Sequence, residues 1–367
     1  MKDLFSPIKI GELELKNRVF MAPLTRSRSG VERIPNSLNV KYYKQRASAG
    51  LIISEATQIS EMGIGYINTP GIHSNEQISG WKKVTDAVHS EGGHIFCQLW
   101  HVGRVSHPVF LNGNLPLAPS PISAGGQIRT NDGIKDRVTP KELSISEIKE
   151  IQNQYRLAAK NSIEAGFDGV ELHGANGYLI DQFLCDGSNQ RTDEYGGTIV
   201  NRFRFLEEIL ELVCKEIGNK KVGIRLSPSG LVNGMFDSEV VRTFSYVIDK
   251  LNNYDLAYLH LLEPYMVIPD TENLEYLRKP TQYFRQIYKG VLISNSGYTF
   301  ETGMEAIQNN VADAISYGKL FISNPDLVYR FKNNLPLNEW DTKTFYTDGE
   351  IGYTDYPNYY NSPNYIT

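Results

Sequence analysis

The segment from His173 to Tyr178 (His-Gly-Ala-Asn-Gly-Tyr) carries three polar side chains that suit catalysis, directly after a run of apolar residues. His173 and Asn176 are neutral donors. Two such donors that converge on one oxygen polarise a carbonyl or nitro group and stabilise the charge that develops there. An unperturbed tyrosine hydroxyl has a pKa of about 10, so Tyr178 suits a proton donor to a basic carbon. The structural alternative is a hydrogen-bonded histidine at a loop start and a tyrosine packed on a rim.

A second group of polar and aromatic residues suits a flat, anionic ligand. Arg225 ends another apolar run, where an arginine either pairs with a buried acid or faces an anionic cofactor or developing anion. The Gln98 amide and the Thr25 hydroxyl suit hydrogen bonds to a planar heterocycle, although each also suits an ordinary strand end. Three aromatic residues suit the walls of a pocket for such a ligand, with core packing as the alternative: Tyr66, Trp100 and Tyr353.

The elements that must position these residues repeat along the chain. Eight short, apolar, β-branched runs predict strands at 18–22, 51–55, 94–100, 169–173, 222–226, 257–261, 291–294 and 314–317. Apolar residues recur with helical spacing between most of them, as at Ile78, Trp81, Val84 and Val88. Ser144 and Glu147 fit a capping box at the start of another helix. Continuous apolar strands that alternate with helices predict an α/β fold, a single (β/α)8 TIM barrel.

Two long connections interrupt this alternation, at 101–143 and 174–197. Both leave the carboxyl ends of strands, which is the face where barrel enzymes carry their active sites. No linker divides the chain. We expect a barrel over residues 1–352 and an irregular arm, rich in Tyr and Asn, over residues 353–367.

The ends of the seventh and eighth strands predict a phosphate site. Barrels often bind phosphate there, together with the N-terminus of a short extra helix. Small residues, Asn295-Ser296-Gly297 and Gly318, would let backbone N–H groups approach a phosphate, and Lys319 supplies a cation. Residues 323–326 (Ser-Asn-Pro-Asp) suggest the start of the helix. The alternative is a simple turn and a surface lysine.

Composition excludes several classes of protein. The chain has 367 residues and a formal net charge of −5, which argues against a nucleic-acid partner. No apolar run is long enough for a membrane span, and the N-terminus has no apolar signal region. The three cysteines, Cys97, Cys185 and Cys214, match no zinc or iron–sulfur spacing, so no metal site is expected. A reducing, cytoplasmic location is the simplest interpretation.

Nearly the whole chain, from Leu4 to Pro357, resembles the Old Yellow Enzyme family of FMN-dependent ene-reductases. Several ordered motifs carry the resemblance: NRVFMAPLT (17–25), AGLIISEA (49–56), QLWH (98–101), ELHGANGY (171–178), SNQRTD (188–193) and GYTDYP (352–357). Several such motifs in order along one barrel are far more specific than any single one.

The resemblance implies an NAD(P)H-dependent flavin oxidoreductase with bound FMN and NADPH or NADH as reductant. Pro23, Thr25, Ala56, Gln98 and Arg225 would contact the flavin rings, and Asn295, Ser296, Gly297, Gly318 and Lys319 would hold the phosphate side. His173 and Asn176 would bind the substrate oxygen, Tyr178 would deliver the proton, and Tyr66, Trp100 and Tyr353 would shape the pocket. Activated alkenes would be reduced by hydride from flavin N5.

Lys319 departs from the family, which usually has arginine there, and a lysine makes a point-charge contact in place of a bidentate one. The residue types leave the electrophile open among α,β-unsaturated carbonyl compounds, quinones, nitroaromatics and nitrate esters. The small-molecule substrate would be the main partner, and a monomer and a homodimer are both compatible with the sequence. The competing hypotheses are a flavin-free phosphate-binding barrel enzyme and a non-catalytic flavin-storing protein.

Overall fold

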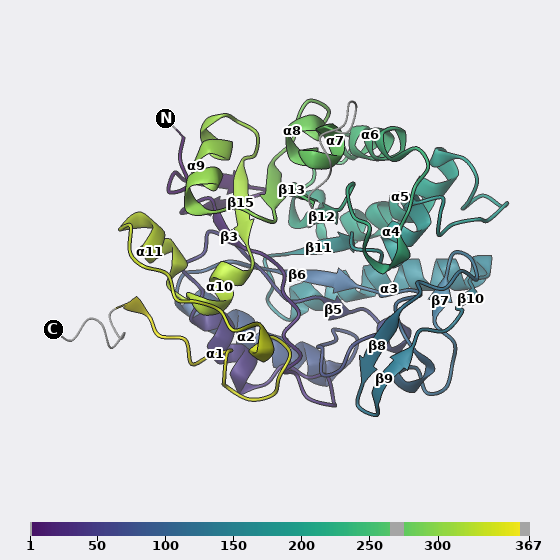
Figure 1. Cartoon of the computed structure of the whole chain (residues 1–367), viewed down its shortest axis with the longest axis horizontal. Helices are drawn as coiled ribbons and strands as arrows, with labels where there is room; N and C mark the ends of the chain where they lie inside the picture. The colour runs from purple at the N-terminus through teal and green to yellow at the C-terminus, as the bar shows by residue number, and fades with distance from the viewer. Residues whose placement is uncertain (1, 265–274, 360–367) are drawn as a thin grey trace.

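A closed ring of parallel strands forms the centre of the computed structural model, which describes residues 2–264 and 275–359. Within these residues eight strands make the ring: β3 (Val19–Met21), β4 (Ile52–Ile53), β6 (Ile95–Trp100), β11 (Gly169–Gly174), β12 (Val222–Leu226), β13 (Tyr258–Leu262), β14 (Leu292–Asn295) and β15 (Ala314–Tyr317). β11 pairs in parallel with both β12 and β6, and the second pairing closes the ring. The predicted TIM barrel and its eight strands are confirmed (Figure 1).

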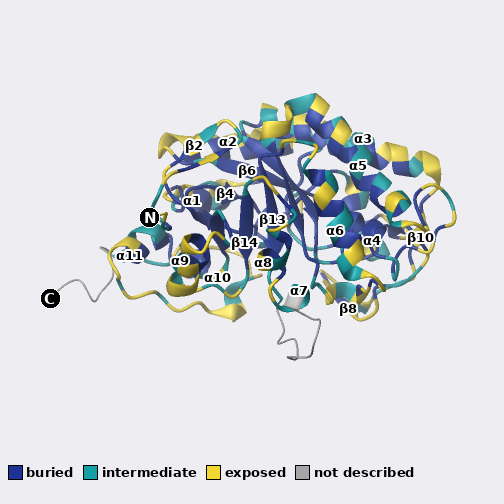
Figure 2. Cartoon of the chain, turned by 90° about the horizontal axis from the view of Figure 1, so that it is seen from above, coloured by how far each residue is buried: buried dark blue, intermediate teal, exposed yellow. Residues whose placement is uncertain are grey.

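Helices surround the ring and cover its outer face. They are α1 (Ser37–Lys44), α2 (Asn75–Ser90), α3 (Ile145–Glu164), α4 (Leu179–Leu184), α5 (Ile199–Ile217), α6 (Val240–Leu251), α7 (Glu275–Arg278), α8 (Pro280–Phe284), α9 (Phe300–Gln308), α10 (Lys319–Ser323) and α11 (Leu327–Lys332). Strands β6, β11, β12 and β13 are buried along their whole length, as continuous apolar runs require. Figure 2 shows the buried strands enclosed by helices with exposed outer faces.

Local sequence signals account for the helix starts. Ser144 caps α3 by accepting a hydrogen bond from the backbone N–H of Glu147, and the Glu147 side chain accepts one from the backbone N–H of Ser144. This is the predicted capping box. Ser74 and Gln77 make the same arrangement at the start of α2.

An N-terminal hairpin closes the bottom of the barrel. β1 (Ile8–Ile10) pairs antiparallel with β2 (Leu13–Leu15). Ile8, Ile10 and Leu15 form one apolar cluster with residues at the amino ends of the barrel strands, including Phe20 and Phe96. This apolar cluster fills the amino end of the barrel, so we expect a ligand to enter from the opposite, carboxyl end.

The two long connections carry structure of their own. The first contains the antiparallel hairpin of β8 (Gln127–Thr130) and β9 (Gly133–Asp136), and the parallel pair β7 (Leu117–Ala118) and β10 (Lys141–Glu142). β5 (Thr57–Gln58) extends the sheet beside β6. The second connection contains α4. The division at residue 352 stays a prediction, and residues 360–367 of the expected arm lie outside the described residues.

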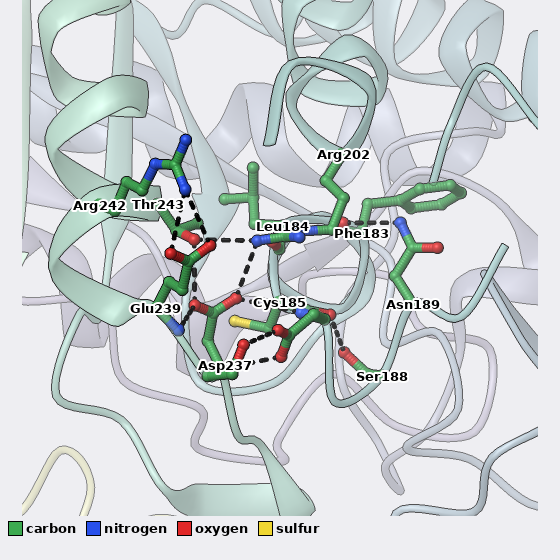
Figure 3. A network of polar contacts seen from close by, with 12 residues as sticks. Phe183, Leu184, Cys185, Ser188, Asn189, Arg202, Asp237, Glu239, Arg242 and Thr243 are labelled. Carbon is green, nitrogen blue, oxygen red and sulfur yellow. Dashed lines mark hydrogen bonds and ion pairs between the residues drawn. The ribbon is translucent and has the colours of Figure 1, made fainter. Parts of the chain in front are cut away.

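A buried ion pair ties α5 to the loop before α6. The Arg202 guanidinium lies 3.2 Å from the Asp237 carboxylate, and both side chains are at most 5% exposed. Arg202 also donates to the backbone oxygen of Leu184, at the end of α4, and to the Thr243 hydroxyl of α6 (Figure 3). One guanidinium thus fixes α4 and α6 relative to α5.

We expect Asp237→Ala to lower the free energy of unfolding by about 3–5 kcal/mol, because Arg202 would stay buried without its counter-charge. Arg242→Ala is the matched control, since it breaks the exposed neighbouring pair with Glu239 and should cost less than about 1 kcal/mol. Urea unfolding of both variants measures the difference. Equal costs for the two variants would contradict this assignment.

Candidate active site

A cavity of about 760 Å³ opens at the carboxyl ends of the barrel strands. The ten residues expected to contact FMN all line it: Pro23, Thr25, Ala56, Gln98, Arg225, Asn295, Ser296, Gly297, Gly318 and Lys319. His173, Asn176, Tyr178 and Trp100 line the same cavity. The barrel therefore brings together residues from seven of its strands and the loops that follow them.

Several buried polar atoms of this cavity lack a partner in the described part of the chain. They are His173 Nδ1, Asn176 Oδ1, Arg225 Nε and Trp100 Nε1. An unpaired buried polar group costs about 1–3 kcal/mol, so a cluster of four points to a ligand that supplies the missing partners. Two of these residues, His173 and Asn176, are the predicted donor pair.

His173 is the second-last residue of β11 and is 4% exposed. Burial, together with the charge of Arg225 and the nearby His260, holds the pKa of His173 well below its usual value. The imidazole is therefore neutral at physiological pH, with one nitrogen as a hydrogen-bond donor. A neutral imidazole N–H polarises an oxygen by hydrogen bonding, whereas an imidazolium could also give up its proton as an acid.

Tyr178 stands at the N-cap of α4 with an extended backbone. Its hydroxyl lies 3.0 Å from the Tyr66 hydroxyl, and its ring packs edge-on against Trp100 and His173. Burial is the main reason that the pKa of Tyr178 is raised well above its usual value. The phenol therefore stays protonated at neutral pH and keeps a proton to donate.

A chain of buried hydrogen bonds fixes the orientation of Gln98. Its side-chain N–H donates to Glu171 Oε1 at 2.7 Å, so the amide oxygen is left to face the cavity. Glu171 Oε2 in turn lies 2.8 Å from His260 Nδ1, and His260 Nε2 lies 2.8 Å from Ser316 Oγ. The Arg225 guanidinium donates to Asn295 Oδ1 and leaves Nε unpaired. Gln98 and Arg225 thus offer an acceptor and a donor, which matches the edge of a heterocycle such as the flavin pyrimidine ring.

The other end of the cavity has the features of an anion site. Ser296 and Gly297 both have a left-handed backbone, with φ of 84° and 76°, and a Cβ at Gly297 would meet open space. Gly318 is the N-cap of α10, which begins at Lys319. The expected helix start at 323–326 is found, since Asp326 is the N-cap of α11, which begins at Leu327, but the helix that begins beside the predicted phosphate loops is α10, at Lys319. Lys319 is exposed, with Nζ 5.9 Å from the centre of the Trp340 ring.

Two of the expected pocket residues do not line the cavity. Tyr66 stands one layer behind it, stacked on Trp100 at 5.2 Å and hydrogen-bonded to Tyr178. Tyr353 is fully buried, and its ring stacks on Tyr42 at 4.1 Å while its hydroxyl accepts from Asn39. The expectation that Tyr353 lines the pocket is wrong, because this stack holds the ring in the core beside α1.

Sequence reasoning missed Phe345 and Tyr346, which line the cavity from the segment after α11. Arg26 and Arg28 hold this segment: both donate to the backbone oxygen of Phe345, and Arg28 also donates to those of Thr344 and Ile351. The signal in the sequence that could have indicated this covering segment is the pair of arginines, Arg26 and Arg28, just after the first barrel strand. Buried arginines need several acceptors, and backbone carbonyls of a covering loop supply them.

Within residues 2–264 and 275–359, no group of three or more His, Cys, Asp or Glu side chains is arranged to hold a metal ion. No helix among the described residues is both long and apolar enough to cross a membrane.

A closed α/β barrel with this cavity at its carboxyl end has the build of a cofactor-dependent barrel enzyme. The family model described as "NADH:flavin oxidoreductase / NADH oxidase family" matches residues 3–338. The chain is 47% identical to "12-oxophytodienoate reductase 7" of Oryza sativa subsp. japonica, over 96% of this chain and 94% of that relative. It is 45% identical to "12-oxophytodienoate reductase 2" of Arabidopsis thaliana, over 96% and 95%.

Solved structures agree. The old yellow enzyme homologue from Zymomonas mobilis superposes with a TM-score of 0.92 at 43% identity, over 97% of this chain and 99% of that one. A morphinone reductase structure gives a TM-score of 0.93 at 44% identity, over 100% and 98%. The chain therefore belongs to the NADH:flavin oxidoreductase / NADH oxidase family, the Old Yellow Enzyme family. It is an FMN-dependent NAD(P)H oxidoreductase of the ene-reductase type, which argues against the flavin-free barrel and the flavin-storing protein.

The left-handed backbone at Ser296 predicts that Ser296→Gly stabilises the FMN-free protein. Relief of about 1–2 kcal/mol of strain exceeds the entropic cost of glycine, about 0.5–1 kcal/mol. We expect the free energy of unfolding to rise by roughly 0.5–1 kcal/mol in urea titrations. Gly297→Ser is the opposite control and should destabilise. A Ser296→Gly protein no more stable than the original would show that the loop accommodates serine without strain.

Proposed function

We propose that this cavity binds FMN with its pyrimidine edge at Gln98 and Arg225 and its phosphate at Ser296, Gly297, Gly318 and Lys319. The donor–acceptor pair of Gln98 and Arg225 supports the first placement, and the left-handed small residues beside a cation support the second. Pro23, Thr25, Ala56 and Asn295 would complete the walls around the ring system.

FMN, when bound, takes electrons from NAD(P)H and supplies a hydride to the electrophile. We further propose that His173 and Asn176 bind the carbonyl or nitro oxygen of an activated alkene. They hold the charge that develops as the β-carbon is reduced. Tyr178, at the edge of the same pair, gives its proton to the α-carbon. The single observation that carries this proposal is that His173 and Asn176 line the cavity beside a buried, protonated Tyr178, and that the buried polar atoms His173 Nδ1 and Asn176 Oδ1 have no partner among the described residues.

The same two donors bind carbonyl and nitro oxygens alike, so the proposed substrate class is the electrophilic alkene conjugated to either group. Trp100, with Tyr66 stacked behind it, gives this class a flat apolar wall. The cytoplasmic location and the monomer or homodimer expected from the sequence stay predictions.

The decisive experiment follows the visible spectrum of the purified protein under anaerobic conditions. NADPH should bleach the flavin band, and 2-cyclohexenone should restore it. A band that bleaches but returns only with a nitro compound or a quinone would replace unsaturated carbonyl compounds by that compound class as the proposed substrate. A protein without flavin absorbance after incubation with FMN would overturn the proposal.

We expect Tyr178→Phe to leave the rate of flavin reduction by NADPH nearly unchanged and to slow flavin reoxidation by 2-cyclohexenone about 10²–10⁴-fold, the usual contribution of a general acid. Stopped-flow absorbance separates the two half-reactions. Tyr66→Phe is the matched control, because it removes the hydroxyl partner of Tyr178 but keeps the donor. A normal reoxidation rate in Tyr178→Phe would remove this residue from proton transfer.

Lys319 should contribute measurably to FMN affinity. Lys319→Met removes the cation and should raise the Kd of FMN about tenfold or more, the usual loss of one charge-assisted hydrogen bond. Lys319→Arg should lower the Kd a few-fold, because a guanidinium can make two bonds to the phosphate. Quenching of FMN fluorescence by the apoprotein gives these values. Equal affinities for Lys, Arg and Met would place the phosphate elsewhere.

A further inference from the structure

The proposed oxygen-binding residue Asn176 lies in an unusual two-residue turn. Asn176 and Gly177 both have a left-handed backbone, with φ of 60° and 75°. Glycine adopts this conformation freely, but for asparagine it is uncommon and less favourable than the right-handed form. Contacts from outside the turn must therefore hold Asn176 in place.

Side chains from three segments satisfy every backbone polar group of this turn. The backbone N–H of Asn176 donates to Ser227 Oγ at 2.8 Å, and that of Gly177 donates to Asp181 Oδ2 at 2.8 Å. The backbone oxygen of Asn176 accepts from the Asn233 side chain at 2.8 Å, and that of Gly177 accepts from the Gln182 side chain at 2.7 Å. The turn is fixed by side chains, with no regular backbone pairing at these two residues.

Asp181 acts on both N–H groups of the turn. Its Oδ2 accepts directly from Gly177 and also lies 3.4 Å from Ser227 Oγ. Because Oδ2 already accepts from the Gly177 N–H, it acts as the acceptor here too, and the Ser227 hydroxyl points its hydrogen toward Asp181. This leaves the lone pairs of Ser227 for the N–H of Asn176. The Asp181 carboxyl group thus accepts from one N–H of the turn and orients the hydroxyl that accepts from the other.

The surroundings make Asp181 a costly residue to keep. It is 2% exposed, and burial raises its pKa to about 7. Cys185 Sγ lies 3.7 Å from Oδ1, the positive charge of Arg104 opposes the rise, and the Arg202–Asp237 pair lies beyond Cys185 (Figure 3). Neither hydride transfer nor protonation, as proposed above, uses this carboxyl group. A buried acid without a chemical role, bonded to the turn that carries Asn176, points to a role in positioning.

We propose that Asp181 is a positioning residue that holds Asn176 in its left-handed conformation, so that the Asn176 amide and the His173 imidazole converge on the substrate oxygen. The inference rests on the proposed role of Asn176. Asp181 does not line the cavity. It belongs to α4, the helix whose N-cap is Tyr178.

The test compares Asp181→Ala, which removes the acceptor, with Asp181→Asn, which keeps an acceptor oxygen for Gly177. Asp186→Asn is the matched control, because Asp186 lies in the same connection but bonds to Ser238 and not to the turn. Two constants are measured: the Kd of 2-cyclohexenone for the oxidised FMN-loaded enzyme, from the change in flavin absorbance, and the Kd of FMN for the apoprotein.

We expect Asp181→Ala to weaken cyclohexenone binding about tenfold, which corresponds to the net contribution of about one hydrogen bond. Asp181→Asn should stay within about threefold of the original protein, and Asp186→Asn should bind as the original does. The Kd of FMN should not change in any of them. A merely structural role would instead weaken FMN and cyclohexenone together, and that result would overturn the inference, as would unchanged cyclohexenone binding in Asp181→Ala.

Two further variants keep the result decisive. If Asp181→Ala does not fold, Ser227→Ala removes the acceptor of the Asn176 N–H and should weaken cyclohexenone binding in the same selective way; unchanged binding would overturn the inference. Asn176→Ala separates the two proposals. If it leaves cyclohexenone binding unchanged, the proposed role of Asn176 itself fails. If it weakens binding while the Asp181 and Ser227 variants do not, only the positioning role fails.

Discussion

The pairing of β11 with both β6 and β12 is the constraint on which the site depends. This pairing closes the sheet into a barrel, and its register puts Glu171 beside Gln98 and His173 beside Arg225. The following pairings continue the series, with Arg225 beside His260 and Asn295 beside Ser316. A shift of one residue in any pairing would turn these side chains to the other face of the sheet. The hydrogen bonds of the barrel thus fix which polar groups meet at the carboxyl end.

The polar groups in this barrel come in two kinds. One kind is fully partnered and orients others: Glu171 turns the Gln98 amide, and Asp181 turns the Ser227 hydroxyl. The other kind is left without a partner among the described residues and belongs to side chains that line the cavity, as His173 Nδ1 and Arg225 Nε do. Because a buried unpaired group is costly, the second kind marks where ligand atoms belong, and the first kind sets their hydrogen-bonding pattern in advance.

The phosphate end and the cover of the cavity are built differently from its floor. Ser296 holds a left-handed backbone that glycine would adopt with less strain, and Lys319 lies exposed over the Trp340 ring. The segment that carries Phe345 and Tyr346 belongs to no strand. It is held by hydrogen bonds that Arg26 and Arg28 donate to its backbone carbonyl groups. The residues proposed to hold the phosphate and to cover the cavity therefore stand on loops, while the proposed reacting groups stand on β11, on the turn after it and at the N-cap of α4.

The sequence by itself determined the barrel, its eight strands and the cavity-lining residues at the strand ends, because burial on both faces leaves a continuous apolar run that is visible locally. It also placed His173, Asn176 and Tyr178 in one short segment at the end of the fourth barrel strand. Only the tertiary structure decided the position of Tyr353, the start of α10 at Lys319, the contribution of Phe345 and Tyr346, and the contact of Asp181 with the Asn176 turn. The contacts that bring Phe345 to the site join residues more than 300 positions apart, and a ring stacked in the core has the same local sequence as one that lines a pocket. Such choices depend on packing between distant segments, which no local pattern encodes.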